Sequence, residues 1–444
     1  MSDIAIGAVC IFGSLFLIQT GMHIGVAMML LSFLGVWSIK SFAVAGKLLA
    51  SSVTTSIASA DFGVIPLFVI MGLFVSVTGM GRDTFDVAAH LTRRIRGGLG
   101  IATVAANAVF AACTGTSIAS ASVFTKVAVP QMVRHGHSLP FAVGVVTGSS
   151  VLGMLIPPSL LMIVFGVLAN ISIGDLFTSG ILPGILLSIF FSLCILVQAR
   201  WRPHFVFAVQ PSRSSGEIEH VPMYILAVKM IPICTLVMIV LGGIYGGFFT
   251  PTEAGGTGAL AAFLIGVARR EISLKVFWEV AIEAGKVTTA ICFLLMAAQL
   301  YSQMLTLSGL PYAVGQWLQT AQLSFVVVLF GYLAVVLLLG CFLDSLSIML
   351  ILLPFVLPVI HGFGADLVWF GLITIVAIEI GLLTPPLGMS VFVVKANLGN
   401  AKITTWQIFM GTMPMTITMG LFLLVVTFFP SISLALLGRS WSWW

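Results

Sequence analysis

The sequence predicts an all-α polytopic membrane protein built from two inverted structural repeats, each with a re-entrant helical hairpin and a broken helix. Three observations support this prediction. The 444-residue chain is 59% hydrophobic and 7% charged, with a mean hydropathy of +1.18, whereas a soluble domain carries about 25% charged residues. Landmarks in the two halves share one constant offset. Basic loops in one half also correspond to uncharged loops in the other.

Apolar segments long enough to cross a bilayer recur along the whole chain. The first of them lacks a basic leader and a small-residue cleavage site, so we expect a retained span rather than a signal peptide. The segments lie near residues 4–20, 22–38, 61–79, 139–169, 175–198, 222–246, 254–268, 288–306, 366–394 and 405–429.

The composition also argues against several other classes of protein. The longest polar stretch, residues 200–221, is typical of a linker and is too short to form a soluble domain. The net charge of +5 comes from short loops between spans, so we expect no nucleic-acid partner. The six cysteines lie singly in apolar runs without a CxxC pair, which favours neither a disulfide framework nor a zinc site.

Two other apolar regions have a polar or small-residue centre. These centres are "CTGTSIASAS" at 113–122 and "CFLDSLS" at 341–347. Backbone at membrane depth must satisfy its own hydrogen bonds unless protein or a water-filled cavity surrounds it. We therefore predict two re-entrant hairpins of half-depth helices, over about 99–133 and 325–360.

The two halves of the chain align at an offset of 228 residues. Small residues and prolines are common in membrane helices, so a chance offset is the simplest alternative. Five landmarks at one offset favour an internal repeat instead. The matching pairs are Cys113 with Cys341, Thr116 with Asp344, Ser117 with Ser345, Pro130 with Pro358, and the double prolines 157–158 with 385–386.

The distribution of basic residues indicates that the repeats are inverted. Loop 80–98 contains four arginines and loop 307–322 contains no Lys or Arg. Loop 170–175 has no positive charge, whereas its counterpart is flanked by Lys395 and Lys402. The positive-inside rule interprets this alternation as opposite orientation. It places the loops with Arg82–Arg96, Arg134, Arg200–Arg213, Arg269–Lys275 and Lys395–Lys402 in the cytoplasm, and leaves Lys40 and Lys47 outside as exceptions.

Both double prolines lie inside apolar segments, in "GMLIPP" (153–158) and "GLLTPP" (381–386). Proline in a helix interior costs about 3 kcal/mol, but it suits the first position of a new helix. We therefore expect an unwound stretch in each segment, with the prolines opening the second half-helix. Freed carbonyls can coordinate a cation, and half-helix N-termini attract an anion. Inverted repeats with matching interrupted helices are typical of secondary transporters with a site near the bilayer midplane.

This interpretation divides the chain into five parts. Residues 41–58 and 271–287 mix charged and apolar faces, so we expect interfacial arm helices there. The parts are scaffold helices with an arm (1–60), the transport elements of the first repeat with a broken helix over 139–169 (61–200), a cytoplasmic linker (201–221), a second scaffold with an arm (222–287), and the transport elements of the second repeat with a broken helix over 366–394 (288–430).

Each hairpin tip is expected to face its own broken helix, and the facing oxygens would form a Na⁺ cage. For any single Ser or Thr, a hydroxyl bonded back to its own helix is an equally good interpretation. The candidate ion-site residues are Gly115, Thr116, Ser117, Ser149, Ser150, Gly153 and Pro157 in the first half, and Asp344, Ser345, Ala377, Gly381 and Thr384 in the second. The candidate substrate residues are Thr116, Ser117, Pro157, Pro158, Asp344, Pro385 and Pro386.

Three charges are predicted to lie at membrane depth, where an ionisable side chain is costly. Asp344 lies at a hairpin tip, where a carboxylate is useful beside a cation. Glu379 and Lys126 have three open interpretations: they pair with each other, carry a proton, or face water. His135 and His137 form an HxH pattern, but no carboxylate or cysteine accompanies them, so a metal site is disfavoured.

At these residues the chain resembles the large membrane subunit of TRAP transporters, the tripartite ATP-independent periplasmic carriers. The resemblance spans nearly the whole sequence and follows the family order of motifs. The matching stretches are "IPLFVIMG" (65–72), "RGGLGIATV" (96–104), "CTGTSIASAS" (113–122), "GMLIPPSL" (153–160), "LFTSGILPG" (176–184), "TPTEAG" (250–255), "FLDSLSIMLILLPFVLP" (342–358) and "GLLTPPLG" (381–388).

The resemblance implies an elevator-type carrier of the ion-transporter superfamily, driven by a Na⁺ gradient, in the bacterial inner membrane. It implies a small four-helix membrane subunit and a periplasmic binding protein that delivers an organic acid carboxylate. We expect the small subunit to be a separate chain, because this sequence starts at the first helix of the large one. The family's ion sites correspond to the two pairs of tip and broken helix.

Three other functions would each require different features of the chain. A stand-alone Na⁺- or H⁺-coupled carboxylate carrier of the same superfamily would need no binding protein. A membrane-embedded enzyme would need a nucleophile–base pair or a metal cluster, and the sequence offers neither. A channel would need a continuous polar stripe, whereas the polarity here is confined to two matched breaks.

Overall fold

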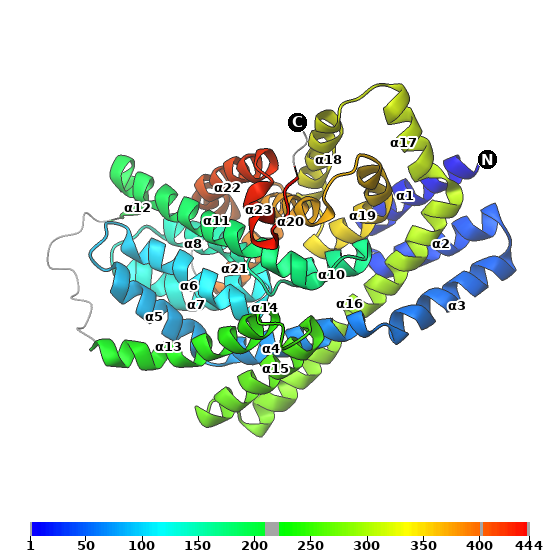
Figure 1. Cartoon of the computed structure of the whole chain (residues 1–444). Coiled ribbons are helices and arrows are strands. Elements are labelled where there is room, and N and C mark those ends of the chain that lie inside the picture. Colours follow the sequence, from blue (N-terminus) through cyan, green and yellow to red (C-terminus); the bar gives the residue numbers. More distant parts are fainter. Residues whose placement is uncertain (1, 209–221, 400–402, 442–444) are drawn as a thin grey trace.

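A computed structural model describes residues 2–208, 222–399 and 403–441 (Figure 1). Within these ranges the chain is helical, apart from turns and one isolated bridge between His137 and Phe207. The expected all-α architecture is therefore confirmed.

The first half runs from α1 to α12. Its helices are α1 (Asp3–Gln19), α2 (Ile24–Ile39), α3 (Phe42–Ala58), α4 (Val64–Val77), α5 (Met80–Thr92), α6 (Gly98–Thr114), α7 (Ser117–Arg134), α8 (Leu139–Ser150), α9 (Leu152–Leu155), α10 (Leu160–Ala169), α11 (Ile173–Trp201) and α12 (Pro203–Val206).

The second half repeats much of this order. Its helices are α13 (Met223–Val237), α14 (Gly243–Tyr245), α15 (Pro251–Ala268), α16 (Leu274–Ser308), α17 (Leu310–Thr320), α18 (Phe325–Gly340), α19 (Ser345–Gly362), α20 (Leu367–Leu383), α21 (Met389–Asn397), α22 (Thr405–Phe428) and α23 (Ser431–Leu434). The hairpins are α6–α7 and α18–α19, and the interrupted helices are α8–α10 and α20–α21.

The core is shared by the two halves. From the first half, α8 and α11 pack against α22 and α7 packs against α21. Likewise, α4 and α2 of the first half pack against α15 and α16 of the second half (Figure 1). Helix α20 lies at the centre, with every residue from Val368 to Leu383 buried. Because each repeat covers the other, neither half has a complete core of its own.

Six helices among the described residues are long and apolar enough to cross a membrane. Helices α4 and α5 add a seventh span if the pair, bent by 63°, counts as one. Helices α1 and α2 have 17 and 16 residues, slightly less than a full span. Large apolar side chains such as Phe12, Phe16 and Trp37 remain exposed on the outer helices. A surface of this kind fits a lipid environment.

Several boundaries differ from the sequence predictions. The expected loops at 80–98 and 307–322 contain the helices α5 and α17. The expected boundary between 287 and 288 falls inside α16, which is continuous over 35 residues. Gly285 is the only strong helix breaker in α16, and a single glycine costs only about 1 kcal/mol in a helix.

The predicted linker is partly structured. Its first residues form α12 and pack back onto the end of the first hairpin, where Ser138 donates to the carbonyl of Phe205 at 2.5 Å. The backbone N–H of Ser138 also donates to the carbonyl of Val206 at 2.9 Å. Residues 209–221 lie outside the described residues.

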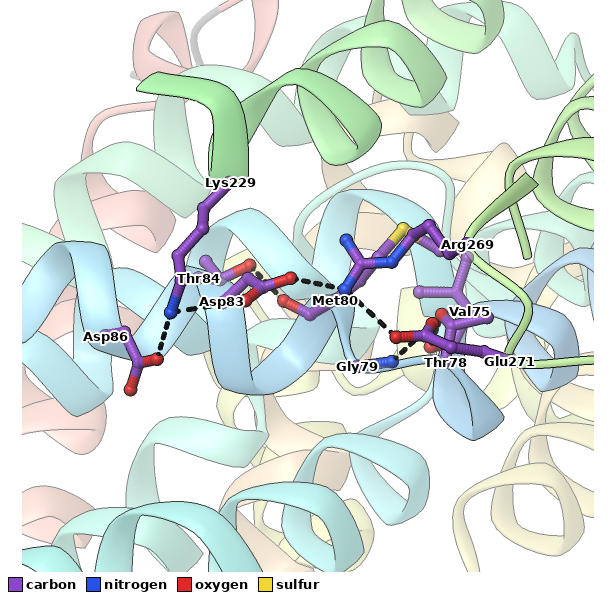
Figure 2. Close-up of polar contacts among 10 residues, drawn as sticks. All are labelled: Val75, Thr78, Gly79, Met80, Asp83, Thr84, Asp86, Lys229, Arg269 and Glu271. Atoms are coloured by element: carbon purple, nitrogen blue, oxygen red, sulfur yellow. Dashed lines mark hydrogen bonds and ion pairs between the residues drawn. The ribbon is translucent and has the colours of Figure 1, made fainter. Parts of the chain in front are cut away.

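A charged network holds the bend between α4 and α5 (Figure 2). Asp83 on α5 accepts from Arg269 at 2.6 Å, and its other oxygen lies 3.5 Å from Lys229 on α13. Lys229 also pairs with Asp86 at 2.6 Å. Glu271 contacts Arg269 at 3.1 Å and accepts the Gly79 N–H at 3.0 Å. The network therefore fastens the start of α5 to α13 and to the turn between α15 and α16.

Candidate functional site

The tip of the first hairpin touches the first helix break. Helix α6 ends before Gly115, which has a φ of +64°. Thr116 then caps α7, since its hydroxyl accepts the Ala119 N–H at 3.3 Å. The carbonyl of Gly115 accepts the N–H of Leu160, the first residue of α10, at 3.1 Å. One backbone hydrogen bond thus joins the hairpin tip to the restarting half-helix.

The first break covers residues 156–159 between α9 and α10. Pro157 and Pro158 lie in it, joined by a cis peptide bond. The expectation that the prolines would open the second half-helix is wrong, because Ser159 takes the capping position. Its hydroxyl accepts the Met162 N–H at 3.4 Å and donates to the Met154 carbonyl at 2.5 Å. A serine side chain can bridge the gap in this way, whereas proline has no side-chain oxygen to accept the bond.

The second half repeats this geometry with different residues. Asp344 caps α19, and its carboxylate accepts from the backbone N–H of Ser347 at 3.2 Å and from the Ser347 hydroxyl. The carbonyl of Cys341, in the tip, accepts the Leu387 N–H at 3.3 Å. Leu387 follows the cis-linked Pro385 and Pro386, and α21 begins two residues later. Here too the prolines precede the half-helix.

Two equivalent glycines let the broken helices touch the hairpins. A Cβ atom on Gly153 would lie 2.5 Å from the carbonyl oxygen of Thr116. A Cβ atom on Gly381 would lie 2.5 Å from the Cα of Gly340. Real side chains do not tolerate such distances to backbone atoms, so only glycine permits this contact. The two positions are 228 residues apart, which matches the offset of the repeat.

The candidate hydroxyls mostly follow the simpler interpretation. Ser149 donates to the Val145 carbonyl, Ser150 to that of Thr147 and Thr384 to that of Ile380, each within its own helix. A hydroxyl that donates its proton keeps oxygen lone pairs that can still face a cation. Ser149 also accepts from the Asn107 side-chain amide at 2.6 Å, so one of its two lone pairs is left. Ala377 is fully buried on α20 and can contribute only backbone.

The two breaks differ in accessibility. Pro157 and Pro158 are buried, whereas Pro385, Pro386 and Leu387 are exposed. Asp344 and Thr384 are half-buried beside the second break. The second break is therefore the more open of the two.

Glu379 is the residue whose contacts sequence reasoning missed. It is 1% exposed, and its Oε1 accepts the hydroxyl of Ser345 at 3.1 Å. The Ser117 hydroxyl interacts with the same carboxylate, although the two fall short of hydrogen-bond geometry. Lys126 is exposed and forms no ion pair with Glu379 among the described residues, so their pairing is excluded. The only sequence signal was the offset that relates Ser117 to Ser345.

The HxH pattern is structural. His137 is buried, and its ring stacks on Phe141 and lies 5.0 Å from that of Phe207. Burial lowers the pKa of His137 to about 4. The neutral ring thus helps to hold the segment after α12 against the end of the hairpin. No group of three or more metal-binding side chains occurs among the described residues.

A cavity of about 590 Å³ lies away from the hairpin tips. It opens between α3 and α16 on one side and the far ends of α10 and α19 on the other. Its polar wall includes Gln299 and Gln303, which accept from Ser56 at 2.5 Å and from Ser52 at 3.1 Å. Asn170, which ends α10, and His361, in the last turn of α19, also line this cavity. The cavity lies beside the direct packing of α16 against α19.

Two helical hairpins whose tips meet two interrupted helices define a polytopic membrane protein of the secondary-transporter class. A family model described as "Tripartite ATP-independent periplasmic transporter, DctM component" matches residues 11–432. The chain belongs to this family, which confirms the resemblance noted in the sequence.

Known relatives agree with this assignment. The chain is 35% identical over 373 residues to the C4-dicarboxylate TRAP transporter large permease protein DctM of Pseudomonas aeruginosa, covering 84% of this chain and 85% of that protein. It is 31% identical over 445 residues to the protein of the same description from Rhodobacter capsulatus, covering 97% and 98%. The crystal structure of the Alcanivorax borkumensis YdaH transporter is similar in fold, with a TM-score of 0.62 and 16% identity over 89% of this chain and 90% of that one.

Proposed function

We propose that this protein is the large membrane subunit of a Na⁺-coupled secondary transporter that imports an organic acid by an elevator mechanism. The observation that carries the proposal is the paired contact between tip and break. The Gly115 carbonyl accepts the Leu160 N–H, and the Cys341 carbonyl accepts the Leu387 N–H, so each hairpin tip is bonded to its own broken helix. Each contact leaves a short non-helical stretch whose carbonyls are free of helical partners.

Two Na⁺ sites would use these oxygens, one in each half. Carbonyls of the breaks, the Thr116 hydroxyl and the lone pairs of Ser149 and Thr384 are hard oxygen donors suited to an alkali cation. Asp344 adds a negative charge to the second site. We assign the first site to Gly115–Ser117 with 149–157, and the second to Asp344 and Ser345 with 377–384.

An organic acid anion would bind between the two tips. Helices α7 and α19 both begin there, and a helix N-terminus attracts a carboxylate through its free N–H groups and its dipole. Thr116, Ser117, Pro157, Pro158, Asp344, Pro385 and Pro386 would surround this anion. The relatives are named for C4-dicarboxylates, so this class of substrate is the first to test.

The elevator movement would shift the hairpin-bearing part against a frame formed by α2, α3 and α16. The cavity of about 590 Å³ lies between α3–α16 and the far ends of α10 and α19, next to the direct contact of α16 with α19, which would have to slide in this movement. We expect the subunit to work in the inner membrane of a bacterium. A small four-helix membrane subunit and a periplasmic binding protein would complete the system.

Reconstitution in liposomes tests the proposal. The purified large and small subunits, with the binding protein loaded with succinate, should take up succinate only under an inward Na⁺ gradient. Replacement of Na⁺ by choline should reduce uptake to the level of protein-free liposomes. Undiminished uptake in choline would overturn the Na⁺ coupling.

The stand-alone carboxylate carrier remains the second candidate. The exposure of the second break favours it, because a free anion could reach Pro385 and Pro386 directly. Uptake by the large subunit alone, at a rate that the binding protein does not change, would select this alternative.

A further inference from the structure

A single buried carboxylate lies where the two hairpins meet. Glu379 sits on α20, which is buried from Val368 to Leu383 and is therefore a rigid support. Its Oε1 accepts from Ser345, the first residue of α19. Ser117, the first residue of α7, interacts with the same carboxylate from the other hairpin. One side chain thus reaches the start of the return helix in both repeats.

The two contacts are not equally complete. The contact with Ser345 is a hydrogen bond of 3.1 Å. On the other side, Glu379 Oε2 and Ser117 Oγ both lack a hydrogen-bond partner, although each is buried. A buried polar atom left without a partner destabilises the arrangement that holds it. A small shift of the first tip would pair these two atoms and remove that destabilisation on both sides.

The position has no equivalent in the first repeat. The residue related to Glu379 by the offset of 228 is Val151, which cannot form a hydrogen bond through its side chain. The link between the tips therefore depends on one carboxylate from the second repeat. Another polar contact between the repeats joins Ser122, in the second turn of α7, to Asn397, the last residue of α21, at 3.0 Å, and does not involve Glu379.

We propose that Glu379 is a positioning residue that couples the two ion sites by bridging Ser345 and Ser117. When an ion orders one hairpin tip, it would fix the position of the Glu379 carboxylate. That position would in turn favour the ion-binding conformation of the other tip. Because it invokes two Na⁺ sites, the inference rests on the proposed function. Allosteric coupling between sites commonly amounts to 5–150-fold in affinity.

The test measures the Na⁺ dependence of uptake in liposomes that contain the complete transporter. Wild-type protein should give a Hill coefficient approaching about 2 for two coupled ions. Glu379→Val, which copies Val151, should lower it to about 1 and raise the half-saturating Na⁺ concentration by about fivefold or more. Glu379→Gln keeps one acceptor and one donor for the two serines, so it should restore most of the cooperativity.

Variants of the serines test the bridge independently if Glu379→Val fails to fold. Ser117→Ala should lower the Hill coefficient, whereas the matched control Ser122→Ala on the same helix, which removes the contact with Asn397 and leaves the Glu379 bridge intact, should leave it unchanged. A merely structural role would reduce the amount of folded protein in both variants without separating their Hill coefficients.

Each other outcome overturns the inference. An unchanged Hill coefficient in Glu379→Val, or a wild-type value of 1, means that Glu379 couples nothing. An equal loss of cooperativity in Glu379→Val and Glu379→Gln means that the negative charge of Glu379, and not its hydrogen bonds to the two serines, is required. Wild-type uptake without any Na⁺ dependence is a different result, because it overturns the proposed function itself.

Discussion

The Arg269 guanidinium donates to the Asp83 carboxylate at 2.6 Å across 186 residues of sequence. Asp83 is only 8% exposed, and it lies on α5 immediately after the bend of 63°. Arg269 follows α15, against which α4 packs. The pair therefore fixes the angle between α4 and the helix that leads into the first hairpin (Figure 2).

Removal of the Asp83 charge should destabilise the folded protein. Asp83→Asn removes the charged partner that Arg269 and Lys229 share, but Arg269 keeps Glu271 and Lys229 keeps Asp86, so we expect a cost of about 1–3 kcal/mol. Thermal unfolding in detergent should show a clearly lower midpoint. Lys275→Gln is the control, because the Lys275–Glu279 pair is exposed and 3.9 Å apart and should change stability by less than about 1 kcal/mol. Equal midpoints for Asp83→Asn and wild type would contradict the role of the network.

A methyl group at Gly381 should separate the second broken helix from its hairpin. Gly381→Ala places a Cβ 2.5 Å from the Cα of Gly340, so the backbones must move apart. Overpacking of this kind costs about 1–3 kcal/mol, and we expect a large loss of uptake. Gly420→Ala on α22 has open space around it and should behave like wild type. Wild-type uptake by Gly381→Ala would show that the close contact is dispensable.

The buried His137 should make stability fall in mild acid. Its pKa is lowered to about 4 by burial, whereas an unfolded histidine titrates near 6.5. Between about pH 6.5 and 4 the unfolded chain binds more protons, so the free energy of unfolding decreases as the pH falls and levels off below 4. The loss should reach about 3 kcal/mol. Melting curves of wild type and His137→Gln from pH 7.5 to 4 check this, and parallel pH profiles would refute it.

Asp344 should matter for its charge as well as for its cap. Asp344→Ala should abolish Na⁺-dependent uptake while the protein remains in the membrane, since the loss of one cap costs only about 1 kcal/mol. Asp344→Ser keeps an oxygen that can cap α19 but removes the charge. If liposomes with Asp344→Ser also show no Na⁺-dependent uptake, the charge of Asp344 is required. Full recovery with serine would leave only the capping role.

The sequence was most informative where local chemistry decides the structure. The hairpin expected over 99–133 corresponds to α6 and α7, because Gly115 and the capping Thr116 define its tip. The broken helix expected over 139–169 begins and ends at those residues, since the double proline excludes a continuous helix. These features depend on neighbouring residues, which the sequence displays directly.

Features that depend on distant residues could not be predicted in this way. The network around Asp83 joins residues up to 192 positions apart, and no periodicity relates them. The contact of Glu379 with Ser345 requires the relative placement of α19 and α20. The position of the prolines before the half-helices was also missed, because Ser159 competes for the cap in a way that the double-proline pattern does not reveal.

The packing of α8 and α11 against α22 has a consequence for biosynthesis. A ribosome releases the first repeat long before the final long helix leaves the exit tunnel, so those early helices must wait in the bilayer without their partner. Insertion and maturation are then separate events, and a chain that stops before residue 405 should enter the membrane yet remain a substrate for quality-control proteases.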